Sequence, residues 1–419
     1  MSKLDELLRE LCPDGVEYKK LGEIATISRG GNFQKKDFLT EGVPCIHYGQ
    51  IYTKYGLFAD KTFTFISEEC AKKQKMARPN DIVMAVTSEN IEDVCKCLAW
   101  LGDEPVAVSG HSAIIHHNQN AKYLVYYFHS QMFFAQKRKL AHGTKVIEVT
   151  PDALVDIALP VPPIEIQREI VRILDNFTNL TAELTAELTA RGIQYSYYRN
   201  KLLTFHSDTK IVQLADIADI GTGSSNTNEA VEDGKYPFFV RSQEPLRKND
   251  FEYDETAIIT AGDGVGVGKV YHYIEGRYAL HQRAYRIHIN TPEVVPKYYF
   301  HYMKAKFLPY IQKTMFQGSV ASIRRPMLNA FPVPVPSLDV QNRIVKVLDN
   351  FEKICSDLNI GLPAEIEARQ KQYEYYRDKL LTFAENGNTI LSRAEQSRAE
   401  QSRAEQSRAE QSRAEQSTD

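Results

Sequence analysis

The stretch VPPIEIQREIVRILDNF at residues 161–177 occurs again as VPSLDVQNRIVKVLDNF at residues 335–351. A second motif is also duplicated, as YSYYRNKLLTF at 195–205 and YEYYRDKLLTF at 373–383. The 419-residue chain is therefore a variable block, a helical block, a second variable block and a second helical block. Internal duplication indicates one architecture used twice. Because the helical copies agree closely and the variable ones only in outline, we expect the helices to share one role and the variable blocks to recognise different things.

The variable blocks also match each other, but more weakly. The matching pairs are LGEIATISRG at 21–30 with LADIADIGTG at 214–223, and KYLVYYFHS at 122–130 with KYYFHYMKA at 297–305. Apolar runs predict strands at 81–87, 257–260 and 285–289, and tyrosine-rich stretches predict helices at 122–140 and 296–315. Both variable blocks are thus expected to be mixed α/β domains.

Apolar residues in the helical blocks recur with steps of four and three, the spacing of a coiled-coil seam. The predicted seam is Ile166, Ile170, Ile173, Phe177, Leu180, Leu184 and Leu188 in the first block, and Val340, Ile344, Val347, Phe351, Ile354 and Leu358 in the second. Gly361 and Pro363 predict a kink or break in the second helix. The expected fold class is α+β, with two pseudo-repeated globular α/β domains separated by two long helices packed as an antiparallel coiled coil.

Five segments follow from this organisation. They are a first globular domain at 1–160, a central helical spacer at 161–206, a second globular domain at 207–334, a C-terminal helical spacer at 335–385 and a low-complexity tail at 386–419.

Composition excludes few classes of protein. The chain has 51 Lys and Arg against 54 Asp and Glu, a formal net charge of −3, which argues against a uniformly basic coat but permits local basic faces. Six irregularly spaced cysteines, including Cys95 and Cys97, favour ordinary thiols over a zinc site. No signal peptide or membrane-spanning run is recognisable, so we expect a soluble, cytoplasmic protein without membrane contact.

We find no pattern that predicts catalysis or a metal site. AGDGVGVGKV at 261–270 resembles a phosphate-binding loop but lacks its spacing, so a tight glycine-rich hairpin is the favoured interpretation. Motifs of an amino-methyltransferase, a zinc protease or a nucleophile elbow are not found. The histidines at 111, 116, 117, 281 and 288 lie in or beside apolar strand patterns, where a hydrogen-bonded structural role is expected.

Polar and basic residues interleave with aromatic ones in several predicted loops. Arg and Lys can pair with guanine or phosphate, and Asn and Gln with adenine, so these loops suit a surface that reads DNA bases. The candidate DNA-binding residues are Asn32, Gln34, Lys35, Lys36, Thr144, Lys145, Arg241, Gln243, His281, Gln282, Arg283, Ser319, Arg324 and Arg325. For any one of them, a solvated loop position is the simpler explanation.

The layout resembles the specificity subunit of type I restriction–modification enzymes. The residues that carry this likeness are the two copies of Q-x-x-I-V-x-x-L-D-N-F, at 167–177 and 341–351, and the two copies of Y-x-Y-Y-R-[ND]-K-L-L-T-F. The resemblance implies that each globular domain is a target-recognition domain reading one half of a split double-stranded DNA site. It also implies that the helices set the spacing and dock two methyltransferase subunits, which restriction subunits join.

The same resemblance implies a non-catalytic subunit without a cofactor of its own. S-adenosylmethionine, ATP and Mg²⁺ are expected in the partner subunits. Two alternatives remain open: a coiled-coil scaffold that does not bind DNA, and a self-sufficient modification enzyme, which would need a cofactor site that the sequence does not reveal.

A tetrapeptide is repeated in TAELTAELTA at 181–190. One TAEL unit adds about 6 Å of helix and rotates the remainder of the helix by about 40°, whereas one base pair adds about 3.4 Å. We expect the repeat to help set the distance between the two DNA half-sites. The alternative is that TAEL is only good helix-forming sequence with leucine on the seam.

The tail repeats SRAEQ five times over residues 392–416. Its polar composition predicts disorder or a solvated helix. The codons AGC-AGA-GCA-GAG-CAG encode this peptide and are also a five-base word written three times. Slippage by one word would shift the reading frame downstream, which suggests a phase-variable end. A coding repeat of fifteen bases that changes only the tail length is the alternative.

Overall fold

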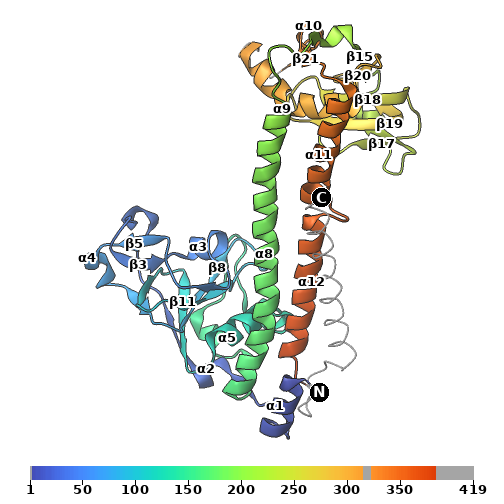
Figure 1. Cartoon of the computed structure of the whole chain (residues 1–419). Helices are drawn as coiled ribbons and strands as arrows, with labels where there is room; N and C mark the ends of the chain where they lie inside the picture. Colours follow the sequence, from blue (N-terminus) through green and yellow to red (C-terminus); the bar gives the residue numbers. More distant parts are fainter. Residues whose placement is uncertain (1, 315–321, 384–419) are drawn as a thin grey trace. The chain divides into compact units, whose positions relative to one another are not determined.

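The structure is a computed structural model that describes residues 2–314 and 322–383. The described residues divide into two compact units, those up to Ala182 together with those from Glu367 onward (unit 1), and those of Glu183–Ile366 (unit 2). Each unit contains one globular part and portions of long helices (Figure 1). The long helix α8 (Ile164–Leu202) contributes to both units.

Unit 1 is built from short strands and helices. In chain order they are α1 (Lys3–Leu11), β1 (Tyr18–Lys20), α2 (Leu21–Ile24), β2 (Ala25–Arg29), η1 (Lys35–Asp37), β3 (Val43–Ile46), α3 (Tyr48–Thr53), β4 (Phe58–Ala59), β5 (Thr64–Ile66), α4 (Glu68–Ala71), β6 (Lys75–Ala77), β7 (Ile82–Ala85), β8 (Thr87–Ser88), β9 (Cys97–Trp100), β10 (Val106–Val108), β11 (Ser112–His117), α5 (Ala121–Phe128), α6 (Gln131–Leu140), β12 (Ile147–Glu148), α7 (Pro151–Leu154) and β13 (Ala158–Pro160).

Two sheets form the centre of unit 1, a five-stranded sheet of order β2-β11-β7-β9-β4 and a four-stranded sheet of order β5-β3-β10-β6. Helix α5 lies between the five-stranded sheet and the first turns of α8 (Figure 1), and residues of all three share one apolar core. The predicted helix at 122–140 is two helices, because Ser130 caps a new helix through a hydrogen bond from Phe133 N to its Oγ.

Unit 2 repeats this plan with fewer and longer strands. In chain order they are β14 (Ile211–Gln213), η2 (Leu214–Asp216), β15 (Ala218–Thr222), η3 (Thr227–Glu229), β16 (Tyr236–Phe239), β17 (Leu246–Lys248), β18 (Tyr253–Ala261), β19 (Tyr271–Leu280), β20 (Ala284–Ile289), α9 (Pro296–Thr314), α10 (Arg325–Asn329), β21 (Pro332–Pro334) and α11 (Leu338–Ser356), followed by α12 (Leu362–Leu381), most of which lies in unit 1.

A six-stranded sheet of order β15-β20-β18-β19-β16-β17 forms the centre of unit 2. Helix α9 packs between this sheet and α11, as α5 does between its sheet and α8 in unit 1. The strands predicted at 81–87, 257–260 and 285–289 are confirmed as β7 with β8, β18 and β20. The glycine-rich stretch 261–270 connects antiparallel β18 and β19, as a hairpin loop longer than a tight turn.

The glutamine of the duplicated motif joins the long helix to the globular part in each unit. Gln167 is fully buried, donates to the carbonyl of Pro162 at 2.8 Å and accepts from Asn120 N at 3.0 Å. Gln341 is equally buried and makes the two corresponding bonds, each at 2.8 Å. Loss of this amide would leave backbone N–H and C=O groups without hydrogen-bond partners, which costs folding free energy. This cost explains why both copies of the motif keep glutamine here.

Tyrosines on α5 and α9 hold the short strand that leads into the long helix. In unit 1, the hydroxyls of Tyr123 and Tyr127 donate to carbonyl oxygens of β13 at 3.0 and 2.6 Å. In unit 2, Tyr298 and Tyr302 donate to carbonyl oxygens of β21 at 2.9 and 3.2 Å. The tyrosine-rich segments seen in the sequence are thus connectors between the sheet and the helices.

The long helices pack against each other within each unit through the two duplicated motifs. In unit 1, Phe177 stacks on Tyr376 with ring centroids 5.3 Å apart. In unit 2 the roles are exchanged, and Phe351 stacks on Tyr198 at 5.8 Å. This pairing runs antiparallel, and the α+β fold class with packed long helices is confirmed.

The predicted break in the second helix is confirmed, since α11 ends at Ser356 and α12 begins at Leu362. A side chain at Gly361 would come within 2.6 Å of the carbonyl oxygens of Lys353 and Asp357, so glycine is required there. Pro363 lies in the first turn of α12, where a missing N–H is tolerated.

The seam residues differ between the two helical blocks. In α8, Ile166, Ile170 and Leu184 are buried, Ile173, Phe177, Leu180 and Leu188 are half-buried, and the buried stripe also includes Val171 and Leu174. In the second block, Ile344 is buried and Phe351 half-buried, but Val340, Val347 and Ile354 of α11, and Leu358 in the turn after it, are 37–74% exposed. The buried face of α11 is instead Gln341, Ile344 and Leu348. This face is turned toward α9, whose core it shares.

Candidate nucleic-acid interface

A three-residue turn at one end of the main sheet is held in the same way in both units. This edge turn is Ser109–His111 in unit 1 and His281–Arg283 in unit 2. The backbone N–H of the first residue of the turn donates to the carbonyl oxygen of the last residue of the neighbouring strand. These bonds are Ser109 N to Ile46 O at 3.1 Å and His281 N to Phe239 O at 2.9 Å. The carbonyl oxygen of the last residue of the turn accepts from a backbone N–H in the loop after β7 in unit 1 and after β18 in unit 2, at 2.9 Å in both units.

These bonds define structurally equivalent positions beside the edge turn. Strand β3 and strand β16 end at the paired residues Ile46 and Phe239, so Tyr48 in unit 1 corresponds to Arg241 in unit 2. In the same way β7 and β18 end at paired Ala85 and Ala261, so Thr87 corresponds to Asp263. The third pair is His111 and Arg283, the last residues of the two edge turns.

In unit 2 these positions form a charged cluster. Asp263 accepts from Arg241 Nη1 at 2.6 Å and from Arg283 Nη1 at 3.3 Å. The side chain of His281 lies among them, is only 5% exposed, and its Nδ1 accepts from Arg283 N at 3.0 Å. Burial lowers the pKa of His281, and repulsion from Arg241 and Arg283 lowers it further, against the attraction of Asp263. The positive charge of this cluster therefore resides on the arginines.

In unit 1 the equivalent positions are two aromatic residues and a threonine. The rings of Tyr48 and His111 lie 4.9 Å apart, and Tyr48 N donates to Ser109 Oγ at 2.9 Å. The ring of His47 lies tilted beside that of Tyr48, with centroids 4.6 Å apart. Burial lowers the pKa of His47, and Lys35 and His111 lower it further. Thr87 is buried and its carbonyl accepts from Tyr52 Oη at 2.7 Å. Neither Tyr48 nor Thr87 carries a charge.

The other candidate residues of unit 1 lie around this edge. A side chain at Gly110 would come within 3.0 Å of Asn32 Oδ1, so Asn32 borders the edge turn. Gln34 precedes the single turn η1, which exposes Lys35 and Lys36. Thr144 and Lys145 are exposed in the connection from α6 to β12, and β12 pairs with β8 beside the edge.

Unit 2 gathers its candidates similarly. Gln282 donates to Asn226 Oδ1, and Gln243 is exposed two residues after Arg241. Backbone pairing of Ser322 with Asp263 brings the following segment to the glycine-rich loop. That segment includes Arg324, which is exposed, and Arg325, which donates to the carbonyl of Ile220. Ser319 lies outside the described residues.

Sequence reasoning did not select Tyr48, Thr87 or Asp263 as members of this edge. Tyr48 and Thr87 are separated from His111 by long stretches of chain, and Asp263 lies in the glycine-rich stretch 261–270, for which the sequence predicts only a hairpin. His111, for which a structural role was expected, lies exposed at the edge. His116, His117 and His288 do have structural partners, Asp81 Oδ1 at 2.6 Å, Gln119 N at 3.1 Å and Thr256 O at 2.8 Å.

One group in the described residues has the ligand types of a metal site. His301 Nε2 lies 2.7 Å from Asp349 Oδ1, and Glu352 is nearby. Lys304 Nζ, however, pairs with Glu352 at 2.7 Å and supplies a cation already. Asp349 corresponds to Asp175 of unit 1, which accepts a hydrogen bond from a tyrosine hydroxyl at 2.7 Å. In both units this aspartate therefore bonds the long helix to the globular part, and the cluster has a structural role.

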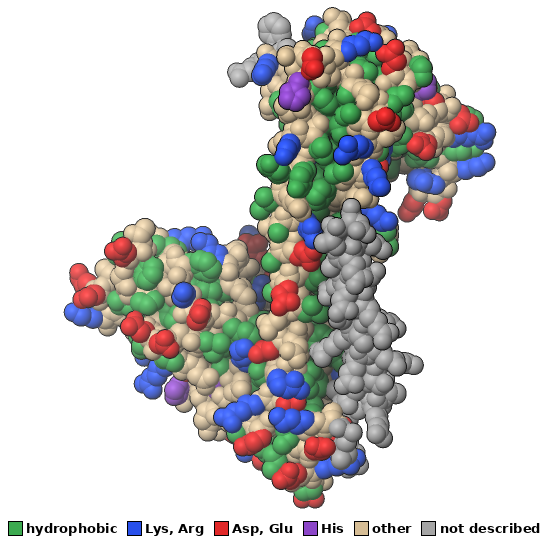
Figure 2. Space-filling view, in the orientation of Figure 1, with side chains coloured by type: hydrophobic (Ala, Val, Ile, Leu, Met, Phe, Trp, Pro, Cys, Tyr) green, Lys and Arg blue, Asp and Glu red, His purple; other side chains and the backbone are tan. Residues whose placement is uncertain are grey.

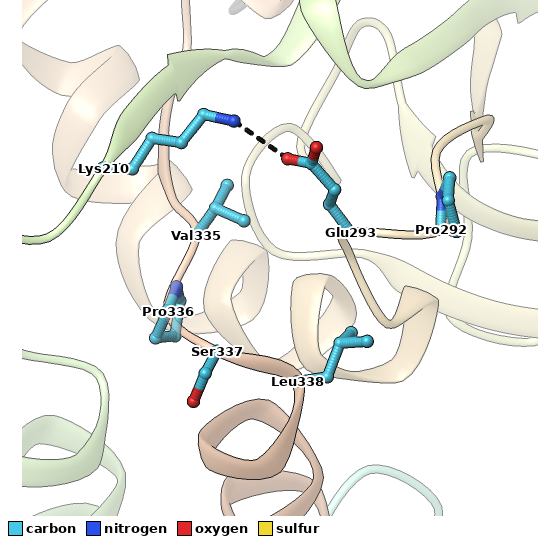
Figure 3. A pocket seen from close by; sticks show the side chains of 7 residues that line it. All are labelled: Lys210, Pro292, Glu293, Val335, Pro336, Ser337 and Leu338. Carbon is cyan, nitrogen blue, oxygen red and sulfur yellow. Dashed lines mark hydrogen bonds and ion pairs between the residues drawn. The ribbon is translucent and has the colours of Figure 1, made fainter.

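A hollow of about 410 Å³ lies in unit 2 beside the segment that leads from β21 into α11. Figure 3 shows Lys210 and Glu293 pointing toward each other across it, joined at 2.8 Å, above Val335 and Pro336. Its charged groups therefore neutralise each other. On the face drawn in Figure 2, acidic and basic side chains are interspersed, which agrees with a local rather than a uniform basic surface.

The chain is similar to known specificity subunits. The family described as type I restriction modification DNA specificity domain matches residues 13–191 and 206–368. The chain is 37% identical to the specificity subunit of the type I restriction enzyme EcoR124I/EcoR124II of Escherichia coli over 251 residues, which are 54% of this chain and 61% of that protein. It is 28% identical over 311 residues to a putative type I restriction enzyme specificity subunit of Haemophilus influenzae, covering 68% of this chain and 77% of the relative.

Solved structures share the fold at low sequence identity. The type I restriction–modification S subunit of M. genitalium covers 88% of this chain and 96% of its own, with a TM-score of 0.57 and 14% identity. A chain from a study of complex assembly and conformational transition of the type I system covers 88% and 98%, with a TM-score of 0.56 and 15% identity.

Two matched domains joined to packed long helices define the class of DNA specificity subunits. The chain belongs to the type I restriction modification DNA specificity family. It is a non-catalytic specificity subunit, of a family that carries no cofactor itself. In the part of the chain that the structure describes, no helix is long and apolar enough to cross a membrane.

Proposed function

We propose that this protein directs a type I restriction–modification complex to a bipartite double-stranded DNA site. In this proposal residues 1–160 and 207–334 are two target-recognition domains, each reading one half-site. The observation that carries it is the edge turn, because one backbone arrangement presents Tyr48 and His111 in unit 1 but Arg241 and Arg283 in unit 2. Different side chains on one framework are what reading two different sequences requires.

The candidate DNA-binding residues belong to this proposal. Those around the edge in unit 1 are Asn32, Gln34, Lys35, Lys36, Thr144 and Lys145, and those in unit 2 are Arg241, Gln243, His281, Gln282, Arg283, Arg324 and Arg325. Because His281 is buried, we assign it a role in supporting the edge turn rather than in touching bases.

We further propose that the helical segments 161–206 and 335–385 set the spacer and dock two methyltransferase subunits, which restriction subunits join. Exposed apolar residues on α11 and in the turn after it support a protein partner there, notably Val340 and Ile354 of α11 at 41% each and Leu358 of the turn at 74%. S-adenosylmethionine, ATP and Mg²⁺ would then be bound by the partners. A cytoplasmic location follows from the DNA substrate.

Methylation mapping tests this function. The chain is co-expressed with the methyltransferase subunit of its own system, and methylated bases are located across the host genome by single-molecule sequencing. The expected result is one split motif with a fixed gap. A stable complex that leaves the genome unmethylated, or methylation at a continuous site, would contradict the proposal.

We also propose that the SRAEQ tail, which lies outside the described residues, is a phase-variable end. The repeat of a peptide that a five-base word can encode supports this idea. The nucleotide sequence is the test: an unbroken five-base period is expected, and synonymous codons that interrupt it would contradict the hypothesis.

A further inference from the structure

We infer that Arg241 and Arg283, positioned by Asp263, read a guanine in the half-site bound by unit 2. This inference rests on the proposed function and deepens it by naming the base and the residues. It also assigns a purpose to the glycine-rich loop at 261–270, which sequence motifs alone left without one.

The two arginines come from different loops and meet on one carboxylate. Arg241 Nη1 and Arg283 Nη1 bind separate oxygens of Asp263, at 2.6 and 3.3 Å. Their side chains are 42% and 61% exposed, while that of Asp263 is 23% exposed. Each arginine therefore bonds the protein through one end of its guanidinium and presents other N–H groups to solvent. A guanidinium offers five such donors in a fixed plane.

The glycines around Asp263 allow its loop to approach the backbone of both arginines. A side chain at Gly262 would lie 2.6 Å from the carbonyl oxygen of Arg283, and one at Gly266 would lie 2.5 Å from that of Arg241. The loop also bonds to its neighbours through Gly262 N to Arg283 O at 2.9 Å and Ile323 N to Gly262 O at 2.8 Å. This contact fixes Asp263 relative to both arginine-bearing loops, which an ordinary surface ion pair would not do.

Guanine is the base that this arrangement suits. Its N7 and O6 are two acceptors side by side in the major groove, and an arginine can bind both at once. Pre-bonding to a carboxylate limits the rotation of each arginine, so less conformational freedom is lost on binding. Unit 1 has Tyr48, Thr87 and His111 at the equivalent positions, so this contact is specific to the half-site of unit 2.

Phosphate binding is the competing role for exposed arginines, and the two roles have different consequences. Loss of a base contact relaxes the preference at one position, whereas loss of a phosphate contact weakens binding to all sequences and reduces its salt dependence. The methylated sequence motif therefore distinguishes a base contact from a phosphate contact.

The test uses the co-expressed complex with the methyltransferase subunit. Variants Arg283→Lys, Arg241→Lys and Asp263→Asn are compared with wild type by genome-wide methylation mapping and by methylation rates on duplexes that differ at single base pairs. The matched control is Arg277→Lys, because Arg277 pairs with Asp254 at 2.9 Å in the same sheet, both about half exposed, away from the edge turn.

We expect about a 10-fold or greater loss of discrimination at one G·C pair of one half-site, with the other half-site and the spacer unchanged. Asp263→Asn should relax the same position as the arginine variants, because it acts through them, and Arg277→Lys should match wild type. An unchanged motif in all three variants, relaxation at an A·T pair, or uniform weakening with a smaller salt dependence would overturn the inference. If wild type itself yields no split motif, the proposed function fails instead.

Discussion

Removal of one TAEL unit, residues 185–188, should shorten the unread gap between the two half-sites without changing either half-site. The unit lies inside α8, a continuous helix of 39 residues, just after the boundary between the two units at residues 182 and 183. Thr185, Ala186 and Glu187 are exposed and Leu188 is half-buried, so the deletion removes no residue of either globular core.

The size of the effect follows from helix geometry. Four residues span about 6 Å along the axis and turn the helix by about 400°, which leaves a net rotation of about 40°. One base pair spans about 3.4 Å and turns DNA by about 35°. The rotation matches one base pair and the length lies nearer to two. We therefore expect a spacer shorter by one base pair, and by two at most.

The assay is methylation mapping of the complex carrying the deletion. The control keeps the length and changes the chemistry, with Thr185→Ala and Glu187→Ala in one variant, and should retain the wild-type spacer. Insertion of a third TAEL unit should lengthen the spacer by the same step. A deletion complex that methylates sites with the wild-type gap, or a length-neutral control that alters the gap, would refute the reasoning.

Three further changes test the fold. Gln341→Leu removes three hydrogen bonds that the buried Gln341 side chain makes to backbone groups. This change should lower the unfolding free energy by about 3 kcal/mol in chemical denaturation, and the exposed substitution Gln243→Leu is the neutral comparison. Phe351→Ala should cost about 2 kcal/mol through its lost ring stack, with a similar cost for Phe177→Ala; no change in either would contradict the helix pairing. Burial lowers the pKa of His117 from 6.5 to about 4. Between these two pH values the unfolded chain therefore binds more protons than the folded one. The unfolding free energy should fall by about 3 kcal/mol as the pH drops from 6.5 to 4. His117→Gln should reduce that pH-dependent loss of stability in thermal melts.

Duplicated sequence determined the architecture of this protein because the residues that join helix to globular part are local and repeated. Gln167 and Gln341 each bond backbone groups beside their own helix, so the motif that contains them is recognisable in both copies. Glycine and proline likewise predicted the break between α11 and α12, since their effect on the backbone needs no distant partner.

Periodicity was less informative on which face of α11 is buried. The steps of three and four from Val340 describe a stripe, but α11 has two neighbours, α9 and the second half of α8, that compete for its faces. Contact with α9 buries Gln341 and Leu348, while Val340 and Val347 stay exposed. A polar residue such as Gln341 is not counted in an apolar pattern, although here it is fully buried.

Only the tertiary structure decided which side chains form the candidate interface. Arg241, Asp263 and Arg283 lie about twenty residues apart along the chain, and sheet pairing brings them together. Their counterparts Tyr48 and His111 share no residue type with them, so no comparison of the two repeats by sequence would align them. Local sequence specifies the repeated helices and their connectors, whereas the reading surface exists because distant strand ends meet at one edge of a sheet.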